Sequence, residues 1–174
     1  MNSGRKYEFS WDLIGDLKKG RPNLGPTTRL EVYRLMQFCL RDVLEKTYGA
    51  EAADKLFYDA GYLAGRHFYE QMMGNPADLD GFVKTLQTQL KDLNIGILRI
   101  EEHDKETGKI VLTVSEDLDC SGLPELEYEI CVYDEGFIAA LLENFSGKKY
   151  SVKEIDCWCT GDRTCRFRAT PQQA

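Results

Sequence analysis

The stretch Glu154-Ile-Asp-Cys-Trp-Cys-Thr-Gly-Asp-Arg-Thr-Cys-Arg-Phe167 places Cys157 and Cys165 on either side of a turn. The turn signal is Thr160-Gly-Asp162, and the residues that flank it have the composition of strands. A hairpin of this kind holds its two cysteine sulfurs close together. The stretch therefore predicts the end of an antiparallel sheet with two neighbouring thiols.

A third thiol, that of Cys131, lies on an alternating segment from Glu127 to Tyr133, which predicts another strand. Zinc prefers four tetrahedral ligands, and thiolates with an occasional His or carboxylate satisfy it. Cys131, Cys157 and Cys165 would supply three of the four. We therefore predict a structural Zn²⁺ site that ties the sheet together, against the alternatives of buried unreactive thiols or a disulfide.

The fourth ligand is open on the residues alone, with Glu154, Cys159 and Cys120 as candidates. Glu154 and Cys157 are an odd number of positions apart, so a regular strand would point them to opposite faces. A bulge near Ile155 is needed if both bind one ion. Cys159 could share the face of Cys157 while the strand persists, and Cys120 lies in a preceding loop.

Composition fits a soluble globular protein of one domain. The chain has 174 residues, 43% hydrophobic and 29% charged, with a formal net charge of −7. The negative charge argues against a nucleic-acid-binding face, and no apolar run approaches the ~20 residues that cross a bilayer. A polar N-terminus without a signal-peptide core predicts a cytoplasmic, reducing setting, where clustered cysteines favour metal binding.

Helical periodicity comes first along the chain and strand periodicity follows. The predicted helices run from Thr27 or Thr28 to Gly49, from about Ala50 to Met73, from Asn75-Pro76 to about Asn94, and from Asp134 or Glu135 to Gly147. The predicted strands cover residues 95–100, 109–115, 127–133, 150–158 and 164–169. The order predicts an α+β fold with N-terminal helices packed on a C-terminal antiparallel sheet that has one inserted helix.

Small residues and a histidine mark the second predicted helix. Gly61 and Gly65 lie one turn apart, although a glycine inside a helix costs about 1 kcal/mol relative to alanine. This cost indicates close approach of another element or of a ligand. Cys39 lies on the apolar stripe of the first helix, which predicts a buried thiol.

Catalytic signatures are absent from the sequence. It contains no G-x-S-x-G, P-loop, dinucleotide-binding glycine run or HExxH. The chain has two histidines in all, which gives no support to a histidine-based triad. No catalytic residue is predicted.

The sequence resembles the 4-vinyl reductase domain family, which includes the sensor domains of phenol- and xylene-responsive transcription activators. The matching motifs are Cys131-Val-Tyr-Asp-Glu-Gly-Phe-Ile-Ala-Ala140, Gly147-Lys148, Glu154-x-x-Cys157-x-x-x-Gly161-Asp-x-x-Cys165-Arg-Phe167, Gly20-Arg-Pro-Asn-Leu-Gly25 and Gly61-Tyr-x-x-Gly65. Spacings of 26 and 8 residues between Cys131, Cys157 and Cys165 are similar to the zinc spacing of the aromatic-sensing members.

The resemblance implies a fold shared with subunits of vesicle-tethering complexes and with nitric-oxide-sensing haem domains. It implies Glu154 as the fourth zinc ligand, and a hydrophobic pocket between helices and sheet that binds a small hydrophobic or aromatic molecule. Residues 1–26 would form an arm that supports a homodimer, 27–170 the ligand-binding domain, and 171–174 a tail. We expect ligand contacts from Gly61, Gly65, His67, Phe68 and Phe82.

Three functions follow from this resemblance. The first is a sensor that signals to an attached output domain or a partner. The second is a tetrapyrrole-binding or accessory role in vinyl reduction, although the sequence has no nicotinamide or flavin motif to supply a hydride. The third is a scaffold protein without a ligand.

Overall fold

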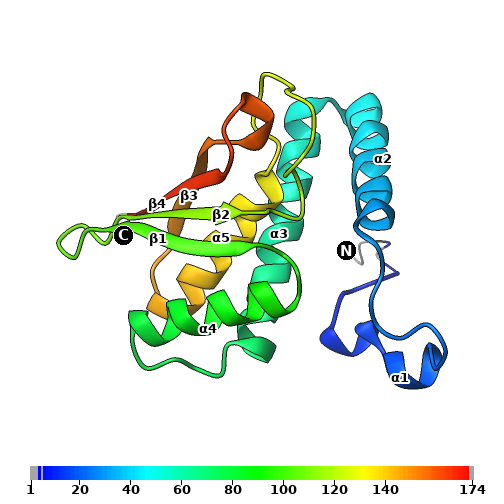
Figure 1. Cartoon of the computed structure of the whole chain (residues 1–174), viewed down its shortest axis with the longest axis horizontal. Coiled ribbons are helices and arrows are strands. Elements are labelled where there is room, and N and C mark those ends of the chain that lie inside the picture. The colour runs from blue at the N-terminus through cyan, green and yellow to red at the C-terminus, as the bar shows by residue number, and fades with distance from the viewer. Residues whose placement is uncertain (1–3, 5, 173–174) are drawn as a thin grey trace.

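Helices precede a four-stranded antiparallel sheet in the computed structural model, which describes residue 4 and residues 6–172 (Figure 1). The helices are α1 (Leu17–Gly20), α2 (Leu30–Tyr48), α3 (Ala50–Met72), α4 (Leu79–Asp92) and α5 (Val132–Ser146), with short 3-10 turns η1 (Trp11–Ile14) and η2 (Trp158–Thr160). The strands are β1 (Ile97–His103), β2 (Ile110–Ser115), β3 (Tyr150–Asp156) and β4 (Cys165–Pro171), in the sheet order β1-β2-β4-β3. The predicted α+β class is confirmed.

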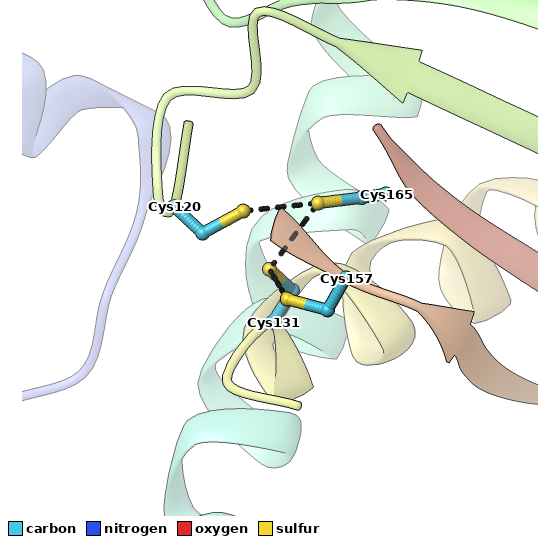
Figure 2. A group of neighbouring side chains, drawn as sticks. All are labelled: Cys120, Cys131, Cys157 and Cys165. Atoms are coloured by element: carbon cyan, nitrogen blue, oxygen red, sulfur yellow. Dashed lines mark hydrogen bonds between the residues drawn. The ribbon is translucent and has the colours of Figure 1, made fainter. Parts of the chain in front are cut away.

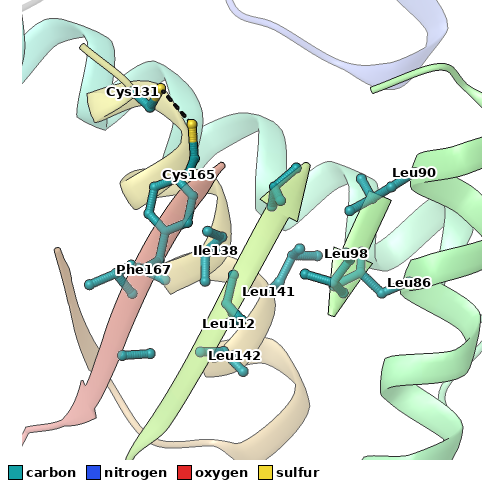
Figure 3. Close-up of a cluster of buried hydrophobic side chains, with 14 of the residues drawn as sticks. Leu86, Leu90, Leu98, Leu112, Cys131, Ile138, Leu141, Leu142, Cys165 and Phe167 are labelled. Carbon is teal, nitrogen blue, oxygen red and sulfur yellow. Dashed lines mark hydrogen bonds between the residues drawn. The ribbon is translucent and has the colours of Figure 1, made fainter. Parts of the chain in front are cut away.

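Helix α5 lies between the sheet and α3 and forms the centre of the molecule (Figure 1). The run Ile138 to Leu142 is buried on every side, as expected for a helix that is apolar all round. Figure 3 shows how its side chains meet Leu112 of β2 and Phe167 of β4, with Leu86 of α4 alongside. The main core is therefore the layer between the sheet, α5 and α4.

Helices α3 and α5 approach each other backbone to backbone at glycines. A methyl group built on Gly61 would lie under 3.0 Å from the carbonyl oxygen of Tyr133, and one on Gly65 would meet that of Phe137 in the same way. Gly136 of α5 faces the backbone of Tyr58 in α3. Close approach of another element thus accounts for the glycines inside α3.

A buried carboxylate joins α5 to β3. Glu135 is 4% exposed and accepts a hydrogen bond from the backbone amide of Glu154 (2.9 Å). Its other oxygen pairs with Nζ of Lys153 (2.9 Å). This contact fixes the start of α5 against the strand that leads to Cys157.

The predicted strand from Glu127 to Tyr133 is wrong. Glu127 has a positive φ of 64°, and the segment ends at Cys131, the residue that caps the N-terminus of α5. Its backbone amides at Leu126 and Glu127 donate to the carbonyl of Cys159 (2.8 and 3.2 Å) instead of to a strand. Alternating polarity here reflects a loop with one face on the protein.

Two predicted helix starts are also wrong. Helix α2 begins at Leu30 after Arg29, which makes no side-chain cap, so the expected cap at Thr27 or Thr28 does not form. Helix α4 begins at Leu79, where the carboxylate of Asp78 accepts the amide of Gly81 (2.8 Å). None of the helices in the described part of the chain is long and apolar enough to span a bilayer.

The apolar stripe of α2 is exposed, contrary to the prediction for Cys39. Cys39 is exposed, and Leu35 keeps 67% of its surface accessible. The same holds for the other stripe residues Val32, Met36, Leu40 and Val43. The stripe lies at the edge of the molecule, where no described segment of the chain covers it (Figure 1).

The two ends of the chain are partly described. The expected arm over residues 1–26 contains η1 and α1, and residues 1–3 and 5 lie outside the described residues. Of the expected tail, Pro171 closes β4, and residues 173–174 are also outside.

Candidate metal centre and ligand cavity

The structure brings together the three cysteines that the sequence singled out. Cys131 caps α5, Cys157 follows β3, and Cys165 begins β4. The sulfur of Cys131 lies 4.0 Å from that of Cys157 and 3.8 Å from that of Cys165 (Figure 2). All three side chains are fully buried.

A fourth sulfur comes from Cys120, in the loop after β2. It lies 3.0 Å from the sulfur of Cys165, and all four sulfurs lie within 4.8 Å of one another (Figure 2). Four thiolates at about 2.3 Å from a zinc ion are about 3.8 Å apart, close to two of the distances observed. The four cysteines are free and could hold a metal ion.

The loop that carries Cys120 is shaped by a carboxylate and a distant arginine. Asp117 accepts the backbone amides of Asp119 (2.8 Å) and Cys120 (3.2 Å) through Oδ1. Arg34 of α2 donates to the carbonyls of Leu118 (2.9 Å), Ser121 (2.9 Å) and Asp117 (3.4 Å). Because the arginine lies more than 80 residues away, the sequence alone gives little sign of this turn.

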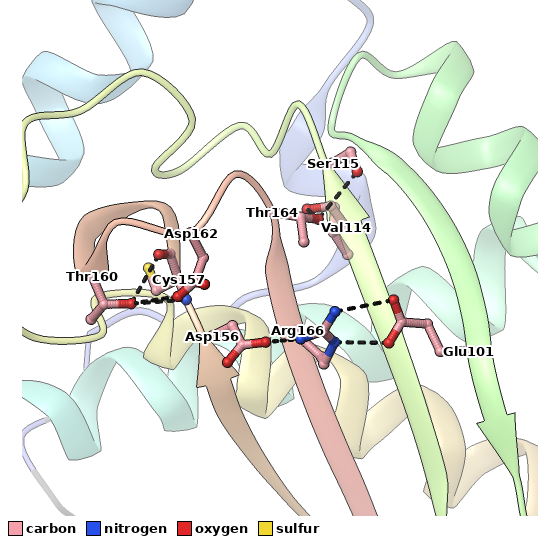
Figure 4. Close-up of polar contacts among 9 residues, drawn as sticks. All are labelled: Glu101, Val114, Ser115, Asp156, Cys157, Thr160, Asp162, Thr164 and Arg166. Carbon is pink, nitrogen blue, oxygen red and sulfur yellow. Dashed lines mark hydrogen bonds and ion pairs between the residues drawn. The ribbon is translucent and has the colours of Figure 1, made fainter.

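The predicted turn at Gly161 forms and orients Cys157. Gly161 has a φ of +99°, and the hydroxyl of Thr160 both accepts the amide of Cys157 (3.1 Å) and donates to its carbonyl (2.9 Å). Below the turn, Arg166 pairs with Asp156 and with Glu101 (Figure 4). These contacts fix the strand ends from which Cys157 and Cys165 project.

Glu154 lies beside the sulfur cluster. The register of β3 against β4 shifts between Glu154 and Asp156, as the predicted bulge near Ile155 requires. Oε2 of Glu154 accepts the backbone amide of Cys131 (3.2 Å), while Oε1 is buried without a partner among the described residues. Burial, with the charge of Cys157 next, raises the pKa of Glu154 to about 9.

Hydrogen bonds among the thiols favour ionisation of one of them. Those from Cys120 foremost, then from Cys131 and Cys165, lower the pKa of Cys157, which makes it the most acidic thiol of the group. Cys159 is buried nearby but does not belong to the four-sulfur group, and burial raises its pKa to about 12.

A cavity of about 300 Å³ lies between the N-terminal arm, α3 and α5. Its wall is mostly apolar and aromatic, with a polar side formed by three aspartates. The lining residues are Phe9, Trp11, Ile14, Tyr33, Ala64, His67, Phe68, Leu93, Ile95, Asp117, Leu118, Asp119, Tyr133, Asp134 and Phe137. A second, smaller cavity of about 40 Å³ lies between α4, the sheet and α5.

The predicted ligand residues fall into three groups. His67 and Phe68 line the larger cavity, where His67 meets the ring of Phe9 edge to face at 5.0 Å. Phe82 lines the smaller cavity and stacks on another ring of the core. Gly61 and Gly65 face the backbone of α5 and line neither cavity.

Three aspartates at the cavity were missed by sequence reasoning. Asp117 and Asp119 stand in a stretch that reads as an ordinary polar loop, and Asp134 as the first-turn acid of a helix. Asp117 and Asp119 are each 4% exposed, and burial, with Asp119 next, raises the pKa of Asp117 to about 7. Only the adjacency of these residues to Cys120 and Cys131 in the chain hinted at a shared location.

Known proteins share both the C-terminal sequence and the fold. Residues 110–171 match the model of the 4-vinyl reductase domain, a segment that holds all four clustered cysteines. An uncharacterised protein of Methanocaldococcus jannaschii, MJ0150, is 26% identical over 156 residues, 90% of this chain and 83% of that protein.

Two solved structures illustrate the shared fold. The phenol-responsive sensory domain of the transcription activator PoxR, in complex with phenol, has a TM-score of 0.60 at 17% identity, over 76% of this chain and 71% of that one. A trafficking protein particle complex subunit 3 from Naegleria fowleri, covalently bound to palmitic acid, has a TM-score of 0.64 at 16% identity, over 83% and 95%. The predicted resemblance is thereby confirmed, and the chain carries a 4-vinyl reductase domain over residues 110–171.

Proposed function

We propose that this protein is a sensory domain that binds a small hydrophobic or aromatic molecule in the larger cavity. The cavity itself carries the proposal. An apolar cavity of ~150 Å³ can hold a benzene molecule, so about 300 Å³ leaves room for a substituted ring. The similar PoxR sensory domain was solved with phenol, which agrees in ligand class.

We further propose that the four-cysteine cluster binds a structural Zn²⁺, with Cys120, Cys131, Cys157 and Cys165 as its ligands. Four thiolates fill the tetrahedral shell, and a catalytic zinc would need an open position for water. When bound, the ion supplies no chemistry beyond cross-linking the segments that hold it. Two of those segments continue directly into the cavity wall, through Asp117 to Asp119 and through Tyr133 to Phe137.

The cavity has a built-in fluorescent reporter. Trp11 lines it, and the second tryptophan of the chain, Trp158, lies at the metal cluster, where its Nε1 donates to the carbonyl of Leu123. In a Trp158→Phe protein we expect 2-phenylethanol or phenol to change the emission of Trp11 in a saturable manner. Fluorescence titration, followed by a thermal shift with the same compounds, measures this.

Two matched alanine variants test the location. Ala64→Phe should fill the cavity and weaken binding by about tenfold or more, because the new ring occupies the ligand volume. Ala60→Phe, one turn earlier on the exposed side of α3, should bind as the parent does. A parent protein that responds to neither compound in either assay would contradict the proposed function.

Homodimer formation through the N-terminal part of the chain is the third element of the proposal. The exposed stripe of α2 is continuous, and Leu56 of α3 is exposed as well. Monomeric proteins rarely expose large contiguous apolar patches. A second copy of the chain would cover the stripe, and the dimer would transmit ligand binding to an output domain or a partner.

Leu35→Asp is expected to convert the dimer to a monomer. In a two-fold interface each substitution acts twice, so burial of about 1.5–3 kcal/mol per leucine corresponds to a loss of about 100-fold or more in dimer affinity. Light scattering coupled to size-exclusion chromatography measures the mass. Thr88→Asp, an equal charge change at an exposed site of α4, is the control and should leave the mass unchanged. A monomeric parent would contradict the proposal.

A further inference from the structure

The polar side of the larger cavity consists of carboxylates. Asp117, Asp119 and Asp134 all line it, although the rest of the wall is predominantly apolar or aromatic. Their ligand-facing side is buried, since Asp117 and Asp119 are each 4% exposed. Three acidic groups in one dry wall are unfavourable unless something on the other side donates to them.

Two of the carboxylate oxygens have no donor. Asp119 accepts the hydroxyl of Tyr33 through Oδ1 (2.8 Å), but its Oδ2 is buried without a partner in the described chain. Oδ2 of Asp134 is in the same condition. Buried polar atoms in proteins are nearly always hydrogen-bonded, so two such acceptors at one cavity indicate that the missing donors belong to a ligand.

The nearby cations are engaged elsewhere. The guanidinium of Arg34 donates to three backbone carbonyls of the loop 117–121. That of Arg41 pairs with Glu45 (2.7 Å) and Asp54 (2.9 Å). The amide of Gln37 approaches Asp119 without completing a hydrogen bond to Oδ2. No described side chain is therefore placed to serve the two acceptors.

We propose that the ligand of this cavity is a small aromatic or apolar amine, bound as an ammonium whose N–H groups donate to Asp119 and Asp134. The inference rests on the proposed function and narrows its ligand class. An ammonium group offers up to three donors, whereas a phenol or alcohol offers one, and two acceptors are open. The rings of Trp11, Tyr33 and Phe137 in the same wall suit a cation by cation–π attraction.

A metal ion fits the same oxygens less well. Asp117, Asp134 and the sulfur of Cys131 lie within 4.8 Å of one another, which is the spacing of a metal site. However, the sulfur of Cys131 also belongs to the four-cysteine cluster. Two carboxylates beside aromatic rings then remain, an environment that matches an organic cation better than a divalent ion.

The test compares three compounds of similar shape by Trp11 emission in the Trp158→Phe protein. Phenethylamine carries the ammonium, 2-phenylethanol is its neutral counterpart, and 3-phenylpropionate carries the opposite charge. We expect phenethylamine to bind at least about tenfold more tightly than 2-phenylethanol, and 3-phenylpropionate not to bind. In Asp134→Asn, at unchanged zinc content, the preference for the amine should fall by about tenfold while binding of the alcohol persists.

The outcomes separate this inference from the proposed function. Equal or tighter binding of 2-phenylethanol would overturn the amine assignment and leave the cavity proposal intact. An amine preference that survives in Asp134→Asn would overturn it as well, as would saturation by Mn²⁺ alone that phenethylamine cannot displace. If none of the three compounds binds, the proposed function itself fails.

Discussion

Cys120→Ser is expected to abolish stoichiometric zinc binding, whereas Glu154→Gln should retain about one zinc per chain. The sulfur of Cys120 completes a group of four that lie within 4.8 Å of one another, and Glu154 is not part of it. An oxygen of Glu154 instead accepts the amide of Cys131, a bond that a glutamine side-chain oxygen can also accept. Elemental analysis with native mass spectrometry gives the zinc content directly.

The loss of the metal should also lower stability. Structural zinc contributes on the order of 10 kcal/mol in zinc-finger peptides, and a domain with its own core depends on it less. If the contribution here is about 5 kcal/mol, Tm should fall by about 10–20 °C in Cys120→Ser or after removal of the ion by a chelator. Thermal unfolding followed by circular dichroism measures the shift.

Cys39→Ser is the matched control for both measurements. Cys39 is an exposed cysteine on α2, so its replacement should change neither zinc content nor Tm. A full complement of zinc in Cys120→Ser, together with its loss in Glu154→Gln, would return the fourth position to Glu154. A full complement in Cys157→Ser would contradict the metal site altogether.

The sequence predicted most of this site because its signals are local. The turn at Gly161 brings Cys157 and Cys165 together within nine residues, and hairpin chemistry is readable from composition. Cys120 could only be held as one candidate of three. Its place depends on Arg34, which reaches the loop from α2, and no local pattern encodes that contact.

The errors have a similar origin in tertiary contacts. Alternation from Glu127 to Tyr133 is typical of a strand, but the hydrogen bonds of this segment go to Cys159, and Cys131 caps a helix. The stripe around Cys39 has the periodicity of a buried helix face, and periodicity cannot say whether the covering surface belongs to the same chain. The aspartates of the cavity wall are invisible for the same reason, since burial of a loop carboxylate is decided by distant segments.

Gly61→Ala is expected to destabilise the protein by about 3 kcal/mol or more, which corresponds to a fall in Tm of about 6–12 °C. Two opposing effects decide the sign. Alanine has a higher helix propensity than glycine by about 1 kcal/mol, which would stabilise α3. The added methyl group would, however, lie under 3.0 Å from the carbonyl oxygen of Tyr133, and that backbone belongs to the central helix and cannot turn aside.

Urea unfolding of Gly61→Ala measures the effect against Gly20→Ala. An added methyl group at Gly20 has no atom within 4 Å, so that variant should stay within about 0.5 kcal/mol of the parent. A Gly61→Ala protein as stable as the parent, or more stable, would show that α3 and α5 are farther apart than the contact with Tyr133 requires.

The reciprocal glycine extends the test to the geometry of the helix pair. Gly136→Ala would meet the backbone of Tyr58, so it should cost a similar amount alone. Because either methyl group already forces α3 and α5 apart, the double variant should lose less than the sum of the single losses. The same separation would move Ala64 away from Phe137, two residues on opposite helices of the cavity wall. Weaker binding in step with the loss of stability would therefore link the glycine contact to the ligand site.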